Sequence, residues 1–370
     1  MALSLALLTG ALPAWAQSWS EEKAHRALAI AEHFLRPQGS SPIRPPALSF
    51  AIGLDGKLLY SGGVGSAGLG RAATADTVYR IGSVTKQFTA AAVLRMIEQG
   101  ATAPRSRAPI TLDTRIDDMF EGTSDWQVQG QNPITLRTLL NMTSNLPNFT
   151  RRPPEDVDPW GTVRAEKLLS ELKKQKPSGW PGTFEYSNTS YFILAETLQA
   201  AEWPDRAPHP YERVLQSEIF DRAGMASTDF TGYRADRMAI PAYHRRAAFS
   251  NRDWLKGSGD ATSTVHDIFA WNVALMSDQI LSRDMREEMF REAGRVTPTL
   301  YYGMGWFIDE ADGWKRMFHS GSVPGFTAFN CIVQRKLGGR WISITLLTNS
   351  DGVEGLEELA ADLTYLVSTD

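Results

Sequence analysis

Cysteine is almost absent from this chain, because Cys331 is the only one among its 370 residues. An intrachain disulfide is therefore excluded, as are the paired-cysteine spacings that bind metal ions. The sequence also has no H-E-x-x-H segment, and no other metal-ligand pattern replaces it. We therefore expect no metal ion and no other cofactor, and a fold that rests on its hydrophobic core.

An excess of basic charge is also missing. Lys and Arg number 38 against 42 Asp and Glu, which gives a net charge of -4, and no basic stripe runs along the sequence. Nucleic acid is therefore not an expected partner. Hydrophobic residues make up 42% and charged residues 22%, which are ordinary proportions for a globular protein with a substantial core. Disorder is excluded, and the expected partner is a small-molecule or peptide substrate.

Long hydrophobic runs are missing beyond the N-terminus. Residues 1–16 carry no charge, residues 3–12 are mostly apolar, and Ala14-Trp15-Ala16 has a small-x-small cleavage pattern. We interpret residues 1–16 as a signal peptide, without the usual basic n-region, and expect the protein to be exported to the periplasm or secreted. The segment is shorter than the ~20 residues of a membrane helix, so stable membrane insertion is not expected.

The periodicity of the remaining chain favours an α+β fold. A helix capped by Ser20 is expected to end at Pro37. A hairpin is expected from strands 48–54 and 57–61, joined by Asp55-Gly56. An antiparallel meander is expected from later strands at 304–309, 314–319, 326–334 and 340–348, with Gly338-Gly339 as its last turn. Helical patterns are found at 83–99, 137–142, 164–174, 191–200, 211–223, 263–276 and 356–367.

These elements predict an antiparallel sheet flanked by helices, with an inserted, mostly helical lobe at approximately residues 111–250. The first and last helices are expected to cover the same sheet. After the signal peptide, we expect an N-terminal helix and Pro-rich linker over 17–46, and then a single catalytic domain over 47–370.

An S-x-x-K motif with catalytic potential begins at Ser83. The motif occurs three times, with serines at positions 20, 83 and 170, but the first and third lie in charged amphipathic helices. Ser83 instead follows an apolar strand and Gly82, and it opens a nearly uncharged helix. A spacing of three places its hydroxyl near the Lys86 amine. Considered alone, a capping serine with a solvated lysine remains the alternative.

Two more polar elements add to this pair. Tyr186-Ser187-Asn188 precedes an apolar helix, and a tyrosine near Lys86 would couple to its titration. The alternative makes Tyr186 a core-edge aromatic residue and Asn188 a helix cap. His319-Ser320-Gly321 ends an apolar strand with small residues, which would let a substrate backbone pair alongside it. A lone histidine there would otherwise be structural.

The three elements in this order resemble the serine hydrolases of the class C β-lactamase and penicillin-binding-protein superfamily, in which S-x-x-K carries the nucleophile. Further stretches between residues 49 and 370 resemble the same family. They are Pro181-Gly182, Tyr302-Gly303-Met304-Gly305-Trp306, Ser322 through Pro324-Gly325-Phe326, and Leu347-Thr348-Asn349-Ser350. The resemblance implies a β-lactamase/transpeptidase-like fold with its site in the cleft beside a helical lobe.

The resemblance also implies roles for these residues. Ser83 resembles the acylated nucleophile, Lys86 its partner, and Tyr186 the general base that later protonates the leaving group. Asn188 resembles the group that orients Lys86 and the substrate amide. His319, Ser320 and Gly321 resemble the strand that binds substrate, and the backbone N–H groups of Ser322 and Ser83 would form the oxyanion hole.

Departures from the family pattern bear on the substrate. His319 stands where β-lactamases of this class carry lysine, and it looks more like the D-specific peptidases and esterases of the superfamily. Met142 and Asn145 stand where many relatives have histidine and glycine, and asparagine can keep a left-handed backbone. Asp260 stands where relatives often have glycine. We therefore expect a hydrolase of esters or D-amino-acid amides and peptides, with a β-lactamase, or a non-catalytic cell-wall-binding or regulatory homologue, as alternatives.

Overall fold

The structure is a computed structural model that describes residues 19–36, 46–123, 126, 133–158, 163–180, 182–204, 210–230, 236–242, 253–311, 313–336 and 339–368. The interpreted signal peptide, residues 37–45 of the Pro-rich linker, Pro181 of the family-like stretch and Gly338 of the predicted turn lie outside these ranges.

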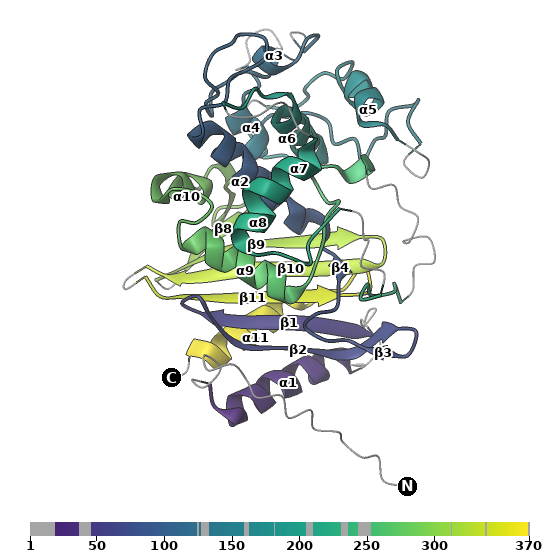
Figure 1. Ribbon diagram of the computed structural model, residues 1–370, viewed down its shortest axis with the longest axis vertical. Helices are drawn as coiled ribbons and strands as arrows, with labels where there is room; N and C mark the ends of the chain where they lie inside the picture. Colours follow the sequence, from purple (N-terminus) through teal and green to yellow (C-terminus); the bar gives the residue numbers. More distant parts are fainter. Residues whose placement is uncertain are drawn as a thin grey trace.

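A nine-stranded antiparallel sheet forms the centre of the described chain (Figure 1). Its strands follow the order β3-β2-β1-β11-β10-β9-β8-β7-β6. The bounds are β1 (Ala47–Leu54), β2 (Lys57–Gly68), β3 (Arg71–Ala72), β6 (Gly294–Arg295), β7 (Leu300–Tyr302), β8 (Phe307–Ala311), β9 (Trp314–Val323), β10 (Phe326–Arg335) and β11 (Trp341–Thr348). Strands β4 (Tyr79–Arg80) and β5 (Thr262–Ser263) pair separately.

The predicted hairpin and meander are confirmed. Asp55 and Gly56 both have positive φ, 50° and 81°, as a two-residue hairpin turn requires. The β8 strand begins at Phe307, three residues later than predicted, because the backbone turns at Gly305 with φ 83°. The edge strands β6 and β7 were not predicted, since they are only two and three residues long and show no alternating pattern.

One face of the sheet is covered by the two ends of the described chain, as predicted (Figure 1). Helix α1 (Glu21–Leu35) begins after Ser20, whose side chain accepts a hydrogen bond from the Lys23 N–H. It packs against α11 (Leu356–Ser368) and β2. The buried positions of α1, Ala27, Ala31 and Phe34, follow the helical period and join one hydrophobic cluster with the sheet.

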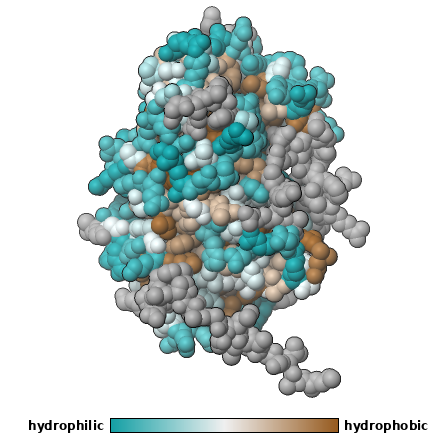
Figure 2. Space-filling model, viewed as in Figure 1, coloured by the Kyte–Doolittle hydropathy of each residue, from teal (hydrophilic) through white to brown (hydrophobic). Residues whose placement is uncertain are grey.

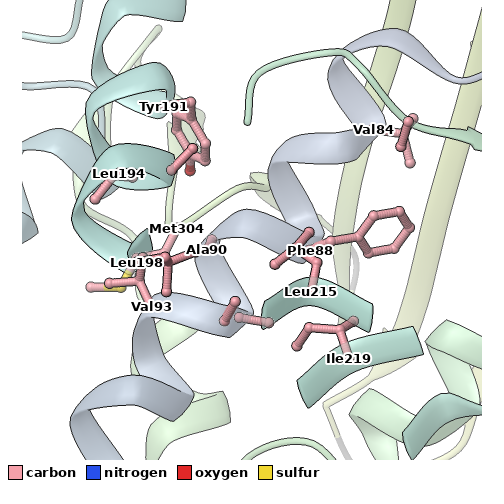
Figure 3. Packing of buried hydrophobic residues seen from close by; sticks show 14 of the residues in the cluster. Val84, Phe88, Ala90, Val93, Tyr191, Leu194, Leu198, Leu215, Ile219 and Met304 are labelled. Carbon is pink, nitrogen blue, oxygen red and sulfur yellow. The ribbon is translucent and has the colours of Figure 1, made fainter. Parts of the chain in front are cut away.

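The opposite face carries the remaining helices, and α2 lies at their centre. The 3-10 turn η2 (Gly82–Val84) leads into α2 (Thr85–Glu98), most of whose side chains are buried. In Figure 3, Phe88 and Val93 of α2 face apolar residues of neighbouring helices. Besides α2, the helical elements on this side of the sheet are α3 (Ile116–Met119), α4 (Leu136–Leu140), α5 (Ala165–Leu172), α6 (Asn188–Ala200), α7 (Tyr211–Leu215), the π turn η4 (Gln216–Phe220), α8 (Asp221–Ala223), α9 (Val265–Met276) and α10 (Arg283–Met289).

The surface shows no continuous hydrophobic band on the face drawn in Figure 2, where small brown patches are separated by hydrophilic residues. Among the described residues, the exposed large hydrophobic side chains are scattered: Leu69, Trp180, Ile240 and Tyr365. Within the same described ranges, none of the helices combines the length and apolar character that crossing a bilayer demands.

Candidate active site

Ser83 sits in the 3-10 turn that opens α2. The turn packs against β9, and Gly82 takes a left-handed φ of 51° to enter it. The N-cap position of α2 is Val84, which makes no side-chain capping bond. The Ser83 hydroxyl is hydrogen-bonded to Lys86 and Tyr186 instead. The capping alternative for Ser83 is therefore not what the structure shows, and the side chain stays half-buried, within reach of solvent.

Lys86 lies in the interior, with none of its surface exposed. Its Nζ donates to Ser83 Oγ at 3.0 Å, to Asn188 Oδ1 at 2.7 Å and to the Ser258 carbonyl at 2.7 Å. Three acceptors match the three N–H donors of an ammonium group. Burial nevertheless lowers the pKa of Lys86 well below its usual range, and the Asp260 carboxylate only partly opposes this shift. The amine form is therefore populated at a lower pH than in a solvated lysine.

The segment 255–260 places the Ser258 carbonyl within hydrogen-bond distance of Lys86. Gly257 has φ 71°, and a Cβ there would lie 2.6 Å from Ala195 Cβ and from the Tyr191 carbonyl. The Gly257 carbonyl accepts a hydrogen bond from Thr89 of α2 at 2.8 Å. Beside it, a buried ion pair joins Lys256 to Glu196 of α6 at 2.7 Å. Glycine at 257 thus lets the segment pack directly onto α6, which fixes the third acceptor of Lys86.

Tyr186 completes the group around the serine. The residue is partly buried, its phenol is hydrogen-bonded to Ser83, and its ring centroid lies 4.9 Å from Lys86 Nζ. Burial raises the pKa of Tyr186 above its usual value of 10, and the hydrogen bond with Ser83 lowers that pKa by less. The phenol is therefore neutral at physiological pH, so it can donate a proton more readily than it can accept one.

The segment 182–187 that presents Tyr186 is held by loop 141–146. The Met142 carbonyl accepts from the Glu185 N–H at 2.9 Å, and the Met142 sulfur lies 3.3 Å from the Ser187 nitrogen. Asn145 has φ 56°, so it keeps the left-handed backbone expected of it. Its amide donates to the Thr183 carbonyl and hydroxyl. Met142 thus replaces the polar anchor of relatives with a weaker sulfur acceptor.

Asn188 begins α6 and links Lys86 to a neighbouring loop. The helix cap itself is Ser187, so the capping alternative for Asn188 is not observed. Its Oδ1 accepts from Lys86, and its Nδ2 donates to Thr150 Oγ1 at 2.8 Å. Thr150 in turn donates to Asn148 at 2.8 Å. The amide orientation follows from these partners, because an ammonium can only donate to the oxygen.

Strand β9 brings a second backbone donor to Ser83. A Cβ on Gly82 would lie 2.8 Å from the Ser322 nitrogen, and one on Gly321 would lie 3.1 Å from the Ser83 nitrogen. The two nitrogens are therefore held near each other by two glycines. Beyond Phe318, β9 pairs only with β10, since the ladder with β8 ends there. The exposed Ser320 and Ser322 thus border a free strand edge, as a substrate-binding strand requires.

Gly321 offers a sharp test of this arrangement, because a Cβ there would lie 1.9 Å from the Ile81 carbonyl oxygen. We expect Gly321→Ala to push β9 away from Ser83 and to lower kcat/KM by about 10²-fold or more, the usual cost of one oxyanion donor. Ester hydrolysis and the melting temperature should both be measured. Gly325→Ala in the next turn is the matched control for general destabilisation, and equal losses of activity in both variants would contradict the prediction.

His319 lies behind this strand edge, in a buried aromatic box. Its ring centroid is 6.0 Å from that of Tyr186, 5.8 Å from Tyr302 and 5.2 Å from Phe307. Its Nε2 lies 3.1 Å from the Tyr302 hydroxyl and its Nδ1 lies 2.6 Å from the Ser320 carbonyl. Burial and the Lys86 charge lower the pKa of His319 to about 3, so the ring is neutral.

The tautomer of His319 follows from these two partners. A carbonyl can only accept, so Nδ1 carries the proton and Nε2 accepts from Tyr302. The structure therefore brings together Ser83, Lys86, Tyr186 and Asn188, with the backbone of β9 at Ser322. Among the described residues, His319 makes no hydrogen bond to Ser83, and its ring packs against that of Tyr186 instead.

Sequence reasoning did not identify three contributors to the site. They are the carbonyl of Ser258, the hydroxyl of Thr150 and the hydroxyl of Tyr302. The first is a backbone group, and no side-chain pattern points to it. Tyr302 belongs to a stretch that resembles the family, but that resemblance did not indicate its contact with His319. Thr150 carries no signal of its own, because its partner Asn188 lies 38 positions away in the chain.

Comparisons with known proteins agree with this arrangement. The family described as Beta-lactamase matches residues 43–368. Among curated proteins, penicillin-binding protein 4* of Bacillus subtilis is 24% identical over 68% of this chain and 57% of its own length. The D-alanyl-D-alanine-carboxypeptidase/endopeptidase AmpH of Escherichia coli is 23% identical over 78% of this chain and 77% of its own. The chain spans little more than half the length of several curated relatives.

Among solved structures, the D-amino acid amidase from Ochrobactrum anthropi SV3 aligns with a TM-score of 0.74. The alignment covers 94% of this chain and 98% of the amidase, at 22% identity. At that identity the likeness concerns the fold, and the predicted antiparallel sheet flanked by helices is confirmed.

Proposed function

The chain belongs to the Beta-lactamase family, and from this premise we propose that it is a serine hydrolase that forms an acyl-enzyme on Ser83. The observation that carries the proposal is the burial of Lys86 between Ser83, Asn188 and Ser258. A lysine so placed has a lowered pKa and lies within hydrogen-bond reach of a half-exposed hydroxyl, which is the arrangement of an activated nucleophile.

In acylation, Ser83 Oγ attacks the carbonyl carbon of the substrate while its proton passes to the amine form of Lys86. The backbone N–H groups of Ser83 and Ser322 receive the developing oxyanion. Tyr186 then gives its hydroxyl proton to the leaving alcohol or amine, and the Lys86 ammonium returns a proton to the phenolate, since Ser83 Oγ is now part of the ester and carries none. We assign the acceptor role to Lys86 rather than to Tyr186, because burial lowers the pKa of the amine and raises that of the phenol.

Deacylation runs the same steps with water. Water takes the place of the departed leaving group and loses a proton toward Tyr186 and Lys86, and its oxygen bonds to the acyl carbon. The tetrahedral intermediate collapses, and Ser83 recovers its proton as the acid departs. Asn188 holds the lysine through the cycle, and its tie to Thr150 keeps the amide oxygen facing Nζ.

For the substrate, we propose an ester or a D-amino-acid amide or peptide. Neutral His319 supports this choice over a β-lactam, because the ring supplies no positive charge at the strand edge where lactamases of this class carry lysine. AmpH and the D-amino acid amidase act on D-amino-acid substrates, as their names state. We also propose that residues 1–16 direct export to the periplasm or the medium.

The test is to incubate the purified full chain with p-nitrophenyl esters, a D-Ala-D-Ala peptide, a D-amino-acid amide and nitrocefin. Mass spectrometry then shows which of them modifies Ser83, and product release gives the rate. Turnover of an ester or D-amide with transient acylation of Ser83 is expected. A chain that turns over none of these and leaves Ser83 unmodified by a fluorophosphonate would be the non-catalytic homologue instead.

A further inference from the structure

A second serine, far from Ser83 in the fold, is aligned with a histidine and a carboxylate. Ser61 of β2 has its Oγ 2.8 Å from Nε2 of His266, the second residue of α9. The other ring nitrogen, Nδ1, lies 3.0 Å from Oδ1 of Asp76, in the turn before β4. The three residues share nothing with the Ser83 group, and they come from segments that only the fold brings together.

The protons of this relay follow from its end groups. A carboxylate accepts and cannot donate, so His266 Nδ1 carries a hydrogen that it donates to Asp76. The neutral ring then has a lone pair on Nε2, and Ser61 must be the donor of the second hydrogen bond. This is the tautomer and direction that general-base activation of a serine needs, with the base oriented by a third group.

The packing of α9 on the hairpin fixes the position of the histidine. Ser61 pairs with Ala51 in the β1–β2 ladder. Two residues along β1, a Cβ at Gly53 would lie 2.2 Å from the Phe269 ring of α9. His266 precedes Phe269 by three positions and therefore lies on the same helix face. The missing side chain at Gly53 thus lets α9 approach closely enough for His266 to reach Ser61.

The relay is open to solvent. Ser61 is half-buried, whereas the side chains of His266 and Asp76 are 38% and 65% exposed. Small reagents can therefore reach the hydroxyl. With His266 and Asp76 this exposed, the relay offers base assistance without a dry, preorganised pocket for an oxyanion. Amides and peptides have poor leaving groups, so their cleavage needs stabilisation of the transition state that this relay does not supply. Esters of acidic alcohols have good leaving groups and need less of it.

We propose that Ser61 is a second acyl-accepting serine, selective for small esters with good leaving groups such as aryl esters. Ser61 Oγ bonds to the acyl carbon as its proton moves to His266 Nε2, and the aryl oxide leaves with the electron pair of the broken ester bond. The imidazolium is stabilised by Asp76 and returns its proton to the aryl oxide or to solvent. Water, deprotonated by the same ring, later releases the acid and restores the serine.

The experiment uses the full chain with Ser83→Ala, so that the proposed main site is silent and its failure cannot be confused with that of Ser61. The protein is incubated with p-nitrophenyl acetate and, separately, with a fluorophosphonate, and adducts are mapped by mass spectrometry. An adduct on Ser61 is expected.

Further variants in the same Ser83→Ala chain separate a relay from an ordinary surface serine. His266→Ala should slow labelling of Ser61 by about 10²-fold, the usual contribution of a general base. Asp76→Asn should slow it by only about tenfold, because that carboxylate is solvated. Ser66→Ala, on the same strand, is the matched control and should change nothing. Absence of any adduct on Ser61, or an adduct whose rate is unaffected by His266→Ala, overturns the proposal.

Discussion

Replacing Ser83 with alanine is expected to lower kcat/KM for the best ester or amide substrate by about 10³-fold or more. The variant keeps the fold, because Ser83 is half-buried and makes no capping bond that α2 needs. What it loses is the only hydroxyl that touches both Lys86 and Tyr186 among the residues described. The rate of amide hydrolysis and the disappearance of the fluorophosphonate adduct at position 83, mapped by mass spectrometry, measure the loss.

The chain supplies its own control in Ser170, another serine of an S-x-x-K motif. Ser170 is exposed on α5, three residues before Lys173, whose Nζ lies 5.8 Å from the Phe120 ring centroid. Ser170→Ala should leave turnover unchanged. An amide or non-activated ester is the better substrate for this comparison, since Ser61 is expected to act only on aryl esters. Undiminished amide hydrolysis by the Ser83→Ala chain would remove Ser83 from the mechanism.

Exchanging Lys86 for methionine is expected to lower kcat/KM by about 10³-fold, within the range for loss of a general base. Methionine keeps much of the buried volume while removing the group that takes the Ser83 proton. It also leaves the Asn188 and Ser258 oxygens without their shared donor, so we expect a lower melting temperature as well. Lys86→Arg should be as inactive, because a guanidinium stays protonated and is larger than the site.

The pH dependence of the parent enzyme checks the same assignment. Because burial lowers the pKa of Lys86, its amine form should become populated at a lower pH than that of a solvated lysine, and acylation should rise with pH as the amine forms. Lys173→Met on α5 is the matched control and should leave both the rate and the pH profile unchanged. Retention of most activity in Lys86→Met would mean that another group accepts the proton.

Local patterns were read correctly where neighbouring residues decide the outcome. The Ser20 cap, the Asp55-Gly56 turn and the helix predicted over 263–276 are confirmed, the last as α9 with Thr264 as its cap. Each depends on contacts three or four residues away or on the φ of one or two positions. The short strands β6 and β7 were not predicted, because pairing holds them in place, β7 with β8 and β6 with β7, rather than any pattern of their own.

The features of the site also fall into those decided by neighbouring residues and those decided by tertiary contacts. The three copies of S-x-x-K have the same residue pattern, and in each the serine and the lysine are three positions apart. The apolar strand before Ser83 and the nearly uncharged helix after it set this copy apart from the other two. The direction of proton transfer could not be predicted from the sequence, because it depends on the burial of Lys86 and Tyr186, which shifts their pKa values. That burial is produced by helices and strands that meet only in the folded chain.

The sequence by itself determined the class of fold, the family and the pair Ser83 and Lys86, because residue periodicity and short spacings are properties of adjacent positions. The tertiary structure alone decided that Ser258 completes the lysine's three acceptors, that Tyr302 takes the free nitrogen of His319, and that His266 reaches Ser61. Those contacts join residues between 17 and 205 positions apart. Their geometry is set by how closely glycine-bearing segments pack, and no local pattern encodes that distance.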